Sequence, residues 1–173
     1  MFGLWVLAVV FGMTIHEFSH ALAGKLQGDS TAESEGRLTL NPLAHIDWLG
    51  FFLLVIAGFG WAKPTPFNPY NLKYKRLGPV LVALAGPISN TLAVVVIGTV
   101  LHFLNEFALV SPNNLMVLFF INLIQVNVLL AVFNLIPIPP LDGSRVLYSI
   151  IGYRRPDIVA FLERYGMWFL LML

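Results

Sequence analysis

Two histidines four residues apart, with a glutamate beside the first, lie inside an otherwise apolar stretch near the start of the chain. The residues are His16, Glu17 and His20, within Met1 to Leu26. Residues four apart on a helix share one face, so both imidazoles can bind one zinc ion, and Glu17 can reach a water molecule at the metal. Ionisable side chains at membrane depth are costly and by default functional. The sequence therefore predicts a metal site here.

The composition predicts that this site lies in a membrane protein. Of the 173 residues, 58% are hydrophobic and 11% are charged, whereas a soluble domain carries about 25% charged residues. The mean hydropathy is +0.81. The length predicts a single domain over residues 1–173. A net charge of +1 implies no nucleic-acid partner, and the lack of cysteine excludes thiolate ligands and a cysteine nucleophile.

Three apolar runs are long enough to cross a bilayer core of about 30 Å, which takes about 20 helical residues. They are Phe2–Leu26, Leu77–Leu104 and Leu115–Ile136. A fourth run, Trp48–Ala62, is short and contains glycines, which leaves a tilted short span or a re-entrant segment open. A fifth, C-terminal apolar run extends from near Ile158 to Leu173 and is interrupted by two charged residues. We expect an all-α polytopic membrane protein with three core transmembrane helices.

The basic residues predict the orientation of these helices. Most of them lie after the first predicted span, before the second or after the third: Lys25, Arg37, Lys63, Lys73, Lys75, Arg76, Arg145, Arg154 and Arg155. The connection 105–114 contains only Glu106 as a charged residue. The positive-inside rule therefore predicts that the basic segments are cytoplasmic, provided that residues 48–62 do not cross the membrane.

A small cytoplasmic β element is also expected after the first span. Polar residues alternate weakly between Gly28 and Asn41, a pattern typical of short strands. We expect an exposed strand edge there to bind an unwound substrate by strand addition.

A second motif, Asn134 to Gly143, follows the third span and contains three prolines. Proline cannot continue a helix, so we expect extended backbone that carries Asp142. Two histidines and one carboxylate form one known ligand set of catalytic zinc sites. Asp142 can complete this set if the first and third spans end on the same membrane side. By spacing alone, an ordinary Asx turn before Gly143 is an equal alternative.

Three motifs in this order resemble those of the site-2 protease family, zinc metalloproteases that cut transmembrane helices within the bilayer. His16–His20 fits the HExxH motif, Gly86–Asn90 fits GPxxN, and Asn134–Gly143 fits NxxPxPxLDG. Residues 41–47 and 61–66 also resemble the compact branch of the family, which lacks PDZ and CBS modules. The resemblance covers most of the chain and implies Zn²⁺ as cofactor.

The resemblance assigns roles to individual residues. It implies that His16, His20 and Asp142 are the metal ligands and that Glu17 is the catalytic base. It also implies that Asn90 supports the site.

The same resemblance implies that Asn134 holds substrate backbone or the developing oxyanion. For Asn134, as for Asn90, the alternative is a hydrogen bond to a neighbouring helix, which is common for asparagine in membranes. His45 is a further candidate for a supporting group, against the alternative of a surface or capping histidine. We expect Gly86 to allow close helix packing and Pro87 to kink the second helix.

The expected activity is hydrolysis of peptide bonds within transmembrane segments. A buried helix pairs its own backbone groups, so the substrate must unwind locally before cleavage. The resemblance implies a single-pass membrane protein as substrate, and we expect a prokaryotic cell membrane with the active site toward the cytoplasm. The alternatives are a membrane zinc carrier or sensor and a catalytically inactive homologue. The clustering of ligands in one site argues against a carrier, and the intact motifs argue against an inactive homologue. The sequence leaves the oligomeric state open.

Overall fold

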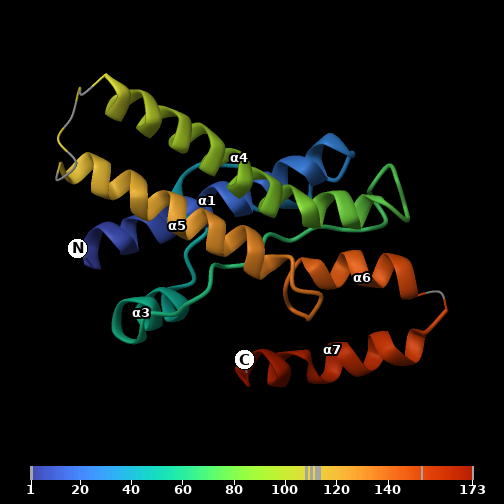
Figure 1. Cartoon of the computed structure of the whole chain (residues 1–173). Coiled ribbons are helices and arrows are strands. Elements are labelled where there is room, and N and C mark those ends of the chain that lie inside the picture. Colours follow the sequence, from blue (N-terminus) through green and yellow to red (C-terminus); the bar gives the residue numbers. More distant parts are fainter. Residues whose placement is uncertain (1, 108, 110, 112–113, 153, 173) are drawn as a thin grey trace.

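The computed structural model describes the chain except for residues 1, 108, 110, 112, 113, 153 and 173. Three long helices, α1 (Phe2–Leu26), α4 (Gly78–Glu106) and α5 (Leu115–Asn134), pack against one another (Figure 1). Each is long and apolar enough to cross a membrane. The three predicted spans are therefore confirmed as helices. Of the predicted connection 105–114, residues 108, 110, 112 and 113 lie outside the described part.

The three-helix bundle has an apolar core cluster and an apolar outer surface. The buried core cluster is formed by Ala8, Val9, Leu54, Leu123 and Val126. The outward surface of α4 and α5 also carries large hydrophobic side chains, among them Leu92, Val95, Val96, Leu129 and Val132. In water this outer surface would be unfavourable, whereas lipid chains match it.

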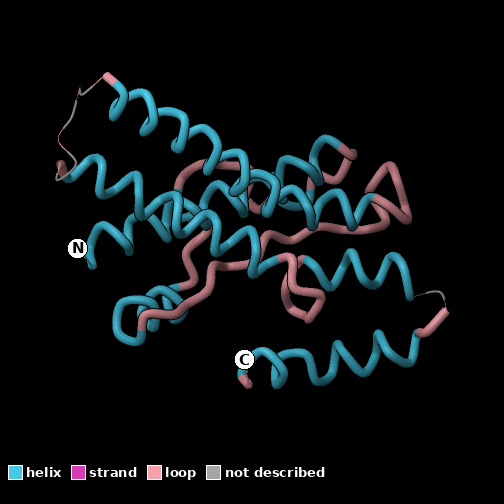
Figure 2. The backbone as a smooth tube through the Cα atoms, viewed as in Figure 1, coloured by secondary structure: helices cyan, strands magenta, loops and turns pink. Residues whose placement is uncertain are grey.

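The fourth apolar run contains one short helix, α3 (Trp48–Ala57). The Asp47 side chain accepts a hydrogen bond from the backbone N–H of Gly50 at 2.9 Å and caps its start. Gly58, with φ of +77°, ends it in the left-handed conformation. Ten helical residues reach only about 15 Å, so α3 is too short to cross the bilayer. The re-entrant alternative is not supported either. After α3 the chain continues as loop past α1 toward α4 (Figure 2).

The predicted β element is wrong. Residues 28–41 contain a one-turn helix, α2 (Thr31–Ser34), and turns, followed by the 3-10 helix η1 (Pro42–Ala44). The Asp29 carboxylate accepts hydrogen bonds from the backbone N–H and the hydroxyl of Thr31 at 3.1 and 2.5 Å. Such local bonds favour a helical turn over a strand. The described residues form no sheet, and an isolated bridge pairs Ile46 with Ala62.

The chain ends in two further helices, α6 (Gly143–Ile151) and α7 (Pro156–Leu171), which lie beside one end of the bundle (Figure 1). The predicted C-terminal apolar segment is thus helical as far as Leu171, and Leu173 lies outside the described residues.

The proline-rich segment between α5 and α6 is not extended as predicted. The backbone N–H of Ile138 donates to Ile136, and that of Leu141 donates to Ile138. The loss of helical donors at the prolines is therefore accommodated by tight turns, which bring the chain back toward α1.

Asp29 fastens the loop after α1 to the loop before α4. Its carboxylate is buried and accepts hydrogen bonds from the backbone N–H of Asn68 at 2.7 Å and the side chain of Asn71 at 3.1 Å. Burial alone would raise the pKa of this carboxyl, but the hydrogen bonds, above all those from Thr31, outweigh burial and lower the pKa below its usual value. The ionised form is therefore the one that the fold stabilises.

Asp29→Asn should destabilise the protein by about 1–3 kcal/mol at pH 7, because the new NH₂ group would face the N–H of Asn68 and leave a buried donor unpaired. A lowered folded-state pKa gives stability above the unfolded pKa of about 3.9 that is lost as pH falls through the folded value. In detergent, the melting temperature of Asp29→Asn should therefore lie furthest below that of the wild type at pH 7, and this difference should shrink below about pH 4. Equal melting temperatures at pH 7 would contradict the assignment.

Candidate metal centre

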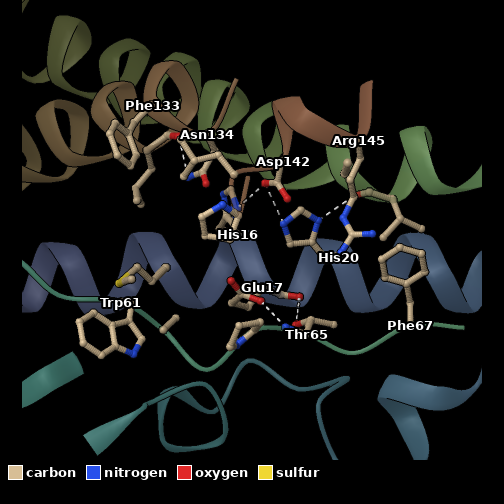
Figure 3. Close-up of a pocket in the computed structure, with 18 of the residues that line it drawn as sticks. His16, Glu17, His20, Trp61, Thr65, Phe67, Phe133, Asn134, Asp142 and Arg145 are labelled. Carbon is tan, nitrogen blue, oxygen red and sulfur yellow. Dashed lines mark hydrogen bonds and ion pairs between the residues drawn. The ribbon is translucent and has the colours of Figure 1, made fainter. Parts of the chain in front are cut away.

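Three of the predicted site residues converge between α1 and the turn that follows α5 (Figure 3). His16 and His20 project from α1, and Asp142 immediately precedes α6. The carboxylate Oδ2 of Asp142 lies 3.1 Å from Nε2 of His16 and 3.2 Å from Nε2 of His20. One ligand atom from each residue lies within 4.8 Å of the others. The histidines are buried and Asp142 is half-buried, so the fold gathers a metal-type ligand set largely out of contact with bulk solvent.

The other ring nitrogens show which atoms face the metal position. Nδ1 of His20 lies 2.7 Å from the carbonyl oxygen of Val82, which can only accept a hydrogen bond, so the proton is on Nδ1. Nδ1 of His16 lies 2.6 Å from Oδ1 of Asn90. In neutral imidazoles, both Nε2 atoms would then present lone pairs to the Asp142 carboxylate. Three electron-pair donors at this separation repel unless a proton or a metal ion lies among them, and two imidazoles with one carboxylate suit zinc.

Gly86 on α4 leaves room for an ion at this point. A Cβ atom added to Gly86 would lie 2.6 Å from Nε2 of His16 and 2.6 Å from Nε2 of His20. The sequence predicts close helix packing at this glycine. In the structure the close approach is to the two Nε2 atoms, so the missing side chain leaves space beside them that an ion could occupy.

Gly86→Ala should weaken zinc binding by more than about tenfold, since the new methyl group would displace both imidazoles. Zinc content after dialysis against a competing chelator measures this loss. Gly98→Ala on the same helix is the control, because a Cβ there has no neighbour within 4 Å. Equal zinc retention in the two variants would show that Gly86 does not shape the site.

Glu17 lines the same cavity, whose volume is about 270 Å³. Its Oε2 accepts a hydrogen bond from the backbone N–H of Thr65 at 2.8 Å, and the Thr65 hydroxyl donates to the Glu17 carbonyl at 3.1 Å. Figure 3 shows the carboxylate directed toward Thr65. One carboxylate oxygen is thus held by a fixed donor, while the other is not hydrogen-bonded within the described part of the chain. The sequence assigns no role to Thr65 itself, although it lies in the segment 61–66 that resembles the compact branch of the family.

The segment that carries Thr65 is itself held by buried residues. The buried Arg37 guanidinium donates a hydrogen bond to the carbonyl of Lys63, and the Lys63 N–H donates to the carbonyl of His45 at 2.8 Å. His45 is 2% exposed, and its Nε2 contacts the carbonyl of Thr39 at 2.8 Å. It ends η1 and does not line the metal cavity. The surface alternative for His45 is therefore wrong, His45 occupies the position that ends η1, and its role as a supporting group stays a prediction.

The remaining predicted residues differ in their contacts. Asn90 is fully buried and contacts His16. Asn134 lines the cavity, and its NH₂ group donates to the carbonyl of Leu130 in its own helix at 3.0 Å. Arg145, which sequence reasoning missed as a cavity residue, stacks over the Phe67 ring at 4.6 Å.

Comparison with known proteins places this architecture among membrane peptidases. The model of peptidase family M50 matches residues 96–173. "Putative zinc metalloprotease YwhC" of Bacillus subtilis is 40% identical over 97% of this chain and 78% of its own length. "Putative zinc metalloprotease Rip2" of Mycolicibacterium smegmatis is 30% identical over 99% of this chain and 67% of its own length. "Putative zinc metalloprotease MJ0611" of Methanocaldococcus jannaschii is 30% identical over 88% of this chain and 76% of its own length. No solved structure gives a significant match.

The long helices are apolar enough to span a membrane, and they pack around two histidines and a carboxylate. Together with the relatives, these features indicate an integral membrane metalloprotease. The chain belongs to peptidase family M50, the site-2 protease family.

Proposed function

We propose that this chain is a zinc-dependent intramembrane protease that hydrolyses peptide bonds within the transmembrane segments of single-pass membrane proteins. The observation that carries the proposal is the convergence of His16, His20 and Asp142 in a cavity that Glu17 also lines, between helices that are apolar on the outside. The names of the curated relatives agree with zinc as the metal.

Each residue has a defined task in this reaction. His16, His20 and Asp142 hold the zinc ion. When bound, zinc supplies Lewis acidity that activates water and polarises a peptide carbonyl. Glu17 takes one proton from the attacking water and delivers it to the leaving amine as the C–N bond breaks, which gives an amine and a carboxylic acid that keeps the second proton of the water until it ionises. The Thr65 N–H holds the Glu17 carboxylate in place for this transfer.

The lining of the cavity supports a hydrophobic, locally unwound substrate. Apolar side chains make up much of it, including Met13, Trp61, Leu130 and Phe133. A helical substrate offers no free carbonyl, since its backbone groups are paired internally. Residues that break helices near the scissile bond should therefore favour cleavage.

We also propose that the site lies toward the cytoplasm of a prokaryotic cell, and the distribution of basic residues supports the cytoplasmic side. The Gln27 side chain donates to the carbonyl of Gly78 at 3.3 Å, so the end of α1 adjoins the start of α4. Lys25 and the basic residues just before α4 thus lie at one end of the bundle, and Glu106 lies at the far end of α4. The positive-inside rule assigns the first end to the cytoplasm.

The test is cleavage of a model single-pass protein by the purified full chain in detergent, compared between zinc-loaded, chelator-stripped and zinc-restored protein. We expect cleavage within the transmembrane segment, located by mass spectrometry, only when zinc is present. Stoichiometric zinc without cleavage of any helix-destabilised substrate would indicate an inactive homologue. Zinc flux into proteoliposomes without cleavage would indicate a carrier.

A further inference from the structure

Two asparagine side chains lie fully buried at the centre of the bundle, Asn90 on α4 and Asn127 on α5, each with 0% exposure. A polar group at this depth is unfavourable unless its hydrogen-bonding atoms are paired. Asn90 contacts the predicted ligand His16. Asn127 belongs to none of the motifs described above and does not line the metal cavity. Its contacts nevertheless lead to the metal site.

Backbone carbonyls fix the orientation of both amide groups. Nδ2 of Asn127 donates to the carbonyl of Leu123 at 2.7 Å, so its Oδ1 faces the other way, 2.7 Å from Nδ2 of Asn90. Nδ2 of Asn90 also donates to the carbonyl of Gly12 at 3.1 Å. A carbonyl can only accept, and both N–H groups of Asn90 are therefore used. The remaining polar atom of the Asn90 side chain is therefore Oδ1, which faces Nδ1 of His16.

We propose that Asn127 is a positioning residue of the metal site, which acts on His16 through Asn90. The chain of hydrogen bonds requires the proton of His16 to be on Nδ1, which leaves the lone pair of Nε2 for the metal. This inference rests on the proposed function and deepens it, because it adds a residue that determines which ring nitrogen of His16 carries the proton. Asn127 itself touches neither the metal position nor the substrate cavity.

Loss of Asn127 should permit the tautomer of His16 that carries its proton on Nε2 and cannot bind the metal through that atom. Without its Oδ1, the carbonyl of Gly12 is the acceptor that remains to hold the Asn90 amide. A flipped Asn90 would present its NH₂ group to Nδ1 of His16, which would then have to accept. The proton would move to Nε2, and that nitrogen could no longer donate a lone pair to the ion.

The test compares zinc affinity in detergent, by competition with a chromogenic chelator, for wild type and Asn127→Leu. Removing a group that orients a ligand typically weakens metal binding 10–100-fold, and we expect a loss in that range. Asn122→Leu is the matched control. Asn122 lies on the same helix, and its NH₂ group makes the equivalent bond to the carbonyl of Leu118 at 2.7 Å. Equal zinc affinity of the two variants would overturn the proposal.

Asn127→Asp should restore near wild-type affinity. A buried carboxylic acid favours its neutral form, which can donate to the carbonyl of Leu123 and accept from Asn90, as the amide does. Such a rescue would show that the two hydrogen bonds made at this position carry the effect, and not the amide group as such. Zinc affinity of Asn127→Asp as low as that of Asn127→Leu would count against the proposal.

A spectroscopic measurement keeps the proposal testable even if Asn127→Leu fails to fold. The protein has four histidines, so ¹⁵N labelling of histidine allows the protonated ring nitrogen of His16 to be identified by NMR in the metal-free wild type. We expect the proton on Nδ1; a proton on Nε2 would overturn the proposal. These readouts are independent of proteolysis. A wild type that binds zinc but cleaves nothing would remove the proposed function and leave the role of Asn127 intact.

Discussion

Glu17→Gln protein should retain its zinc and lose cleavage activity by about 100-fold or more, the usual contribution of a general acid–base group. Glutamine has the same shape as glutamate, and its carbonyl oxygen can still accept the hydrogen bond from the Thr65 N–H. The substitution therefore removes the proton acceptor without removing the contact that orients the side chain. The rate of cleavage of a model transmembrane substrate and the zinc content of the same sample measure the two effects separately.

Glu35→Gln is the control for this experiment, because Glu35 is exposed in the loop that follows α2. It should cleave at the wild-type rate. A Glu17→Gln protein that cleaves at half the wild-type rate or faster would show that another group carries the proton. Simultaneous loss of zinc and activity would instead indicate that Glu17 supports the metal site.

Asp142→Ala should reduce zinc affinity by more than about tenfold, since even groups that only orient a ligand contribute 10–100-fold. Two histidines alone would remain, 4.6 Å apart between ring centroids. Cleavage at limiting zinc should fall with occupancy. Zinc content at defined free zinc concentrations gives the affinity directly.

Asp157→Asn serves as the matched control, since Asp157 is exposed in α7 and pairs with Arg155 at 2.9 Å. Its zinc affinity should equal that of the wild type. Unchanged zinc affinity in Asp142→Ala would favour the simple Asx-turn alternative for Asp142.

The parts of the structure that the sequence predicted are those set by local geometry or by membrane thickness. His16 and His20 face the same way because they are four residues apart on one helix. The three long helices follow from run length. The approach of Asp142 follows from the three-span topology, which places the ends of the first and third spans together.

The parts that the sequence does not predict depend on helix rotation and on contacts made by loops. The polar atoms of Asn127 point inward, but apolar side chains lie on every side of α5, so no hydrophobic face indicates its rotation. The turn at Asp29 is set by side-chain hydrogen bonds to nearby backbone, which the alternation of polar residues does not reveal. The contact of Thr65 with Glu17 joins residues 48 positions apart through a loop without periodicity.

The 126-residue separation between His16 and Asp142 has a consequence for biosynthesis. Ribosomes add about 5–20 residues per second, so a nascent chain would carry both histidines many seconds before the carboxylate is made. The incomplete site offers zinc two ligands, and the substrate cavity lacks the wall supplied by the turn after α5. With the proposed function, proteolytic competence would therefore arise only once Asp142, which follows the last of the three long helices, has been made.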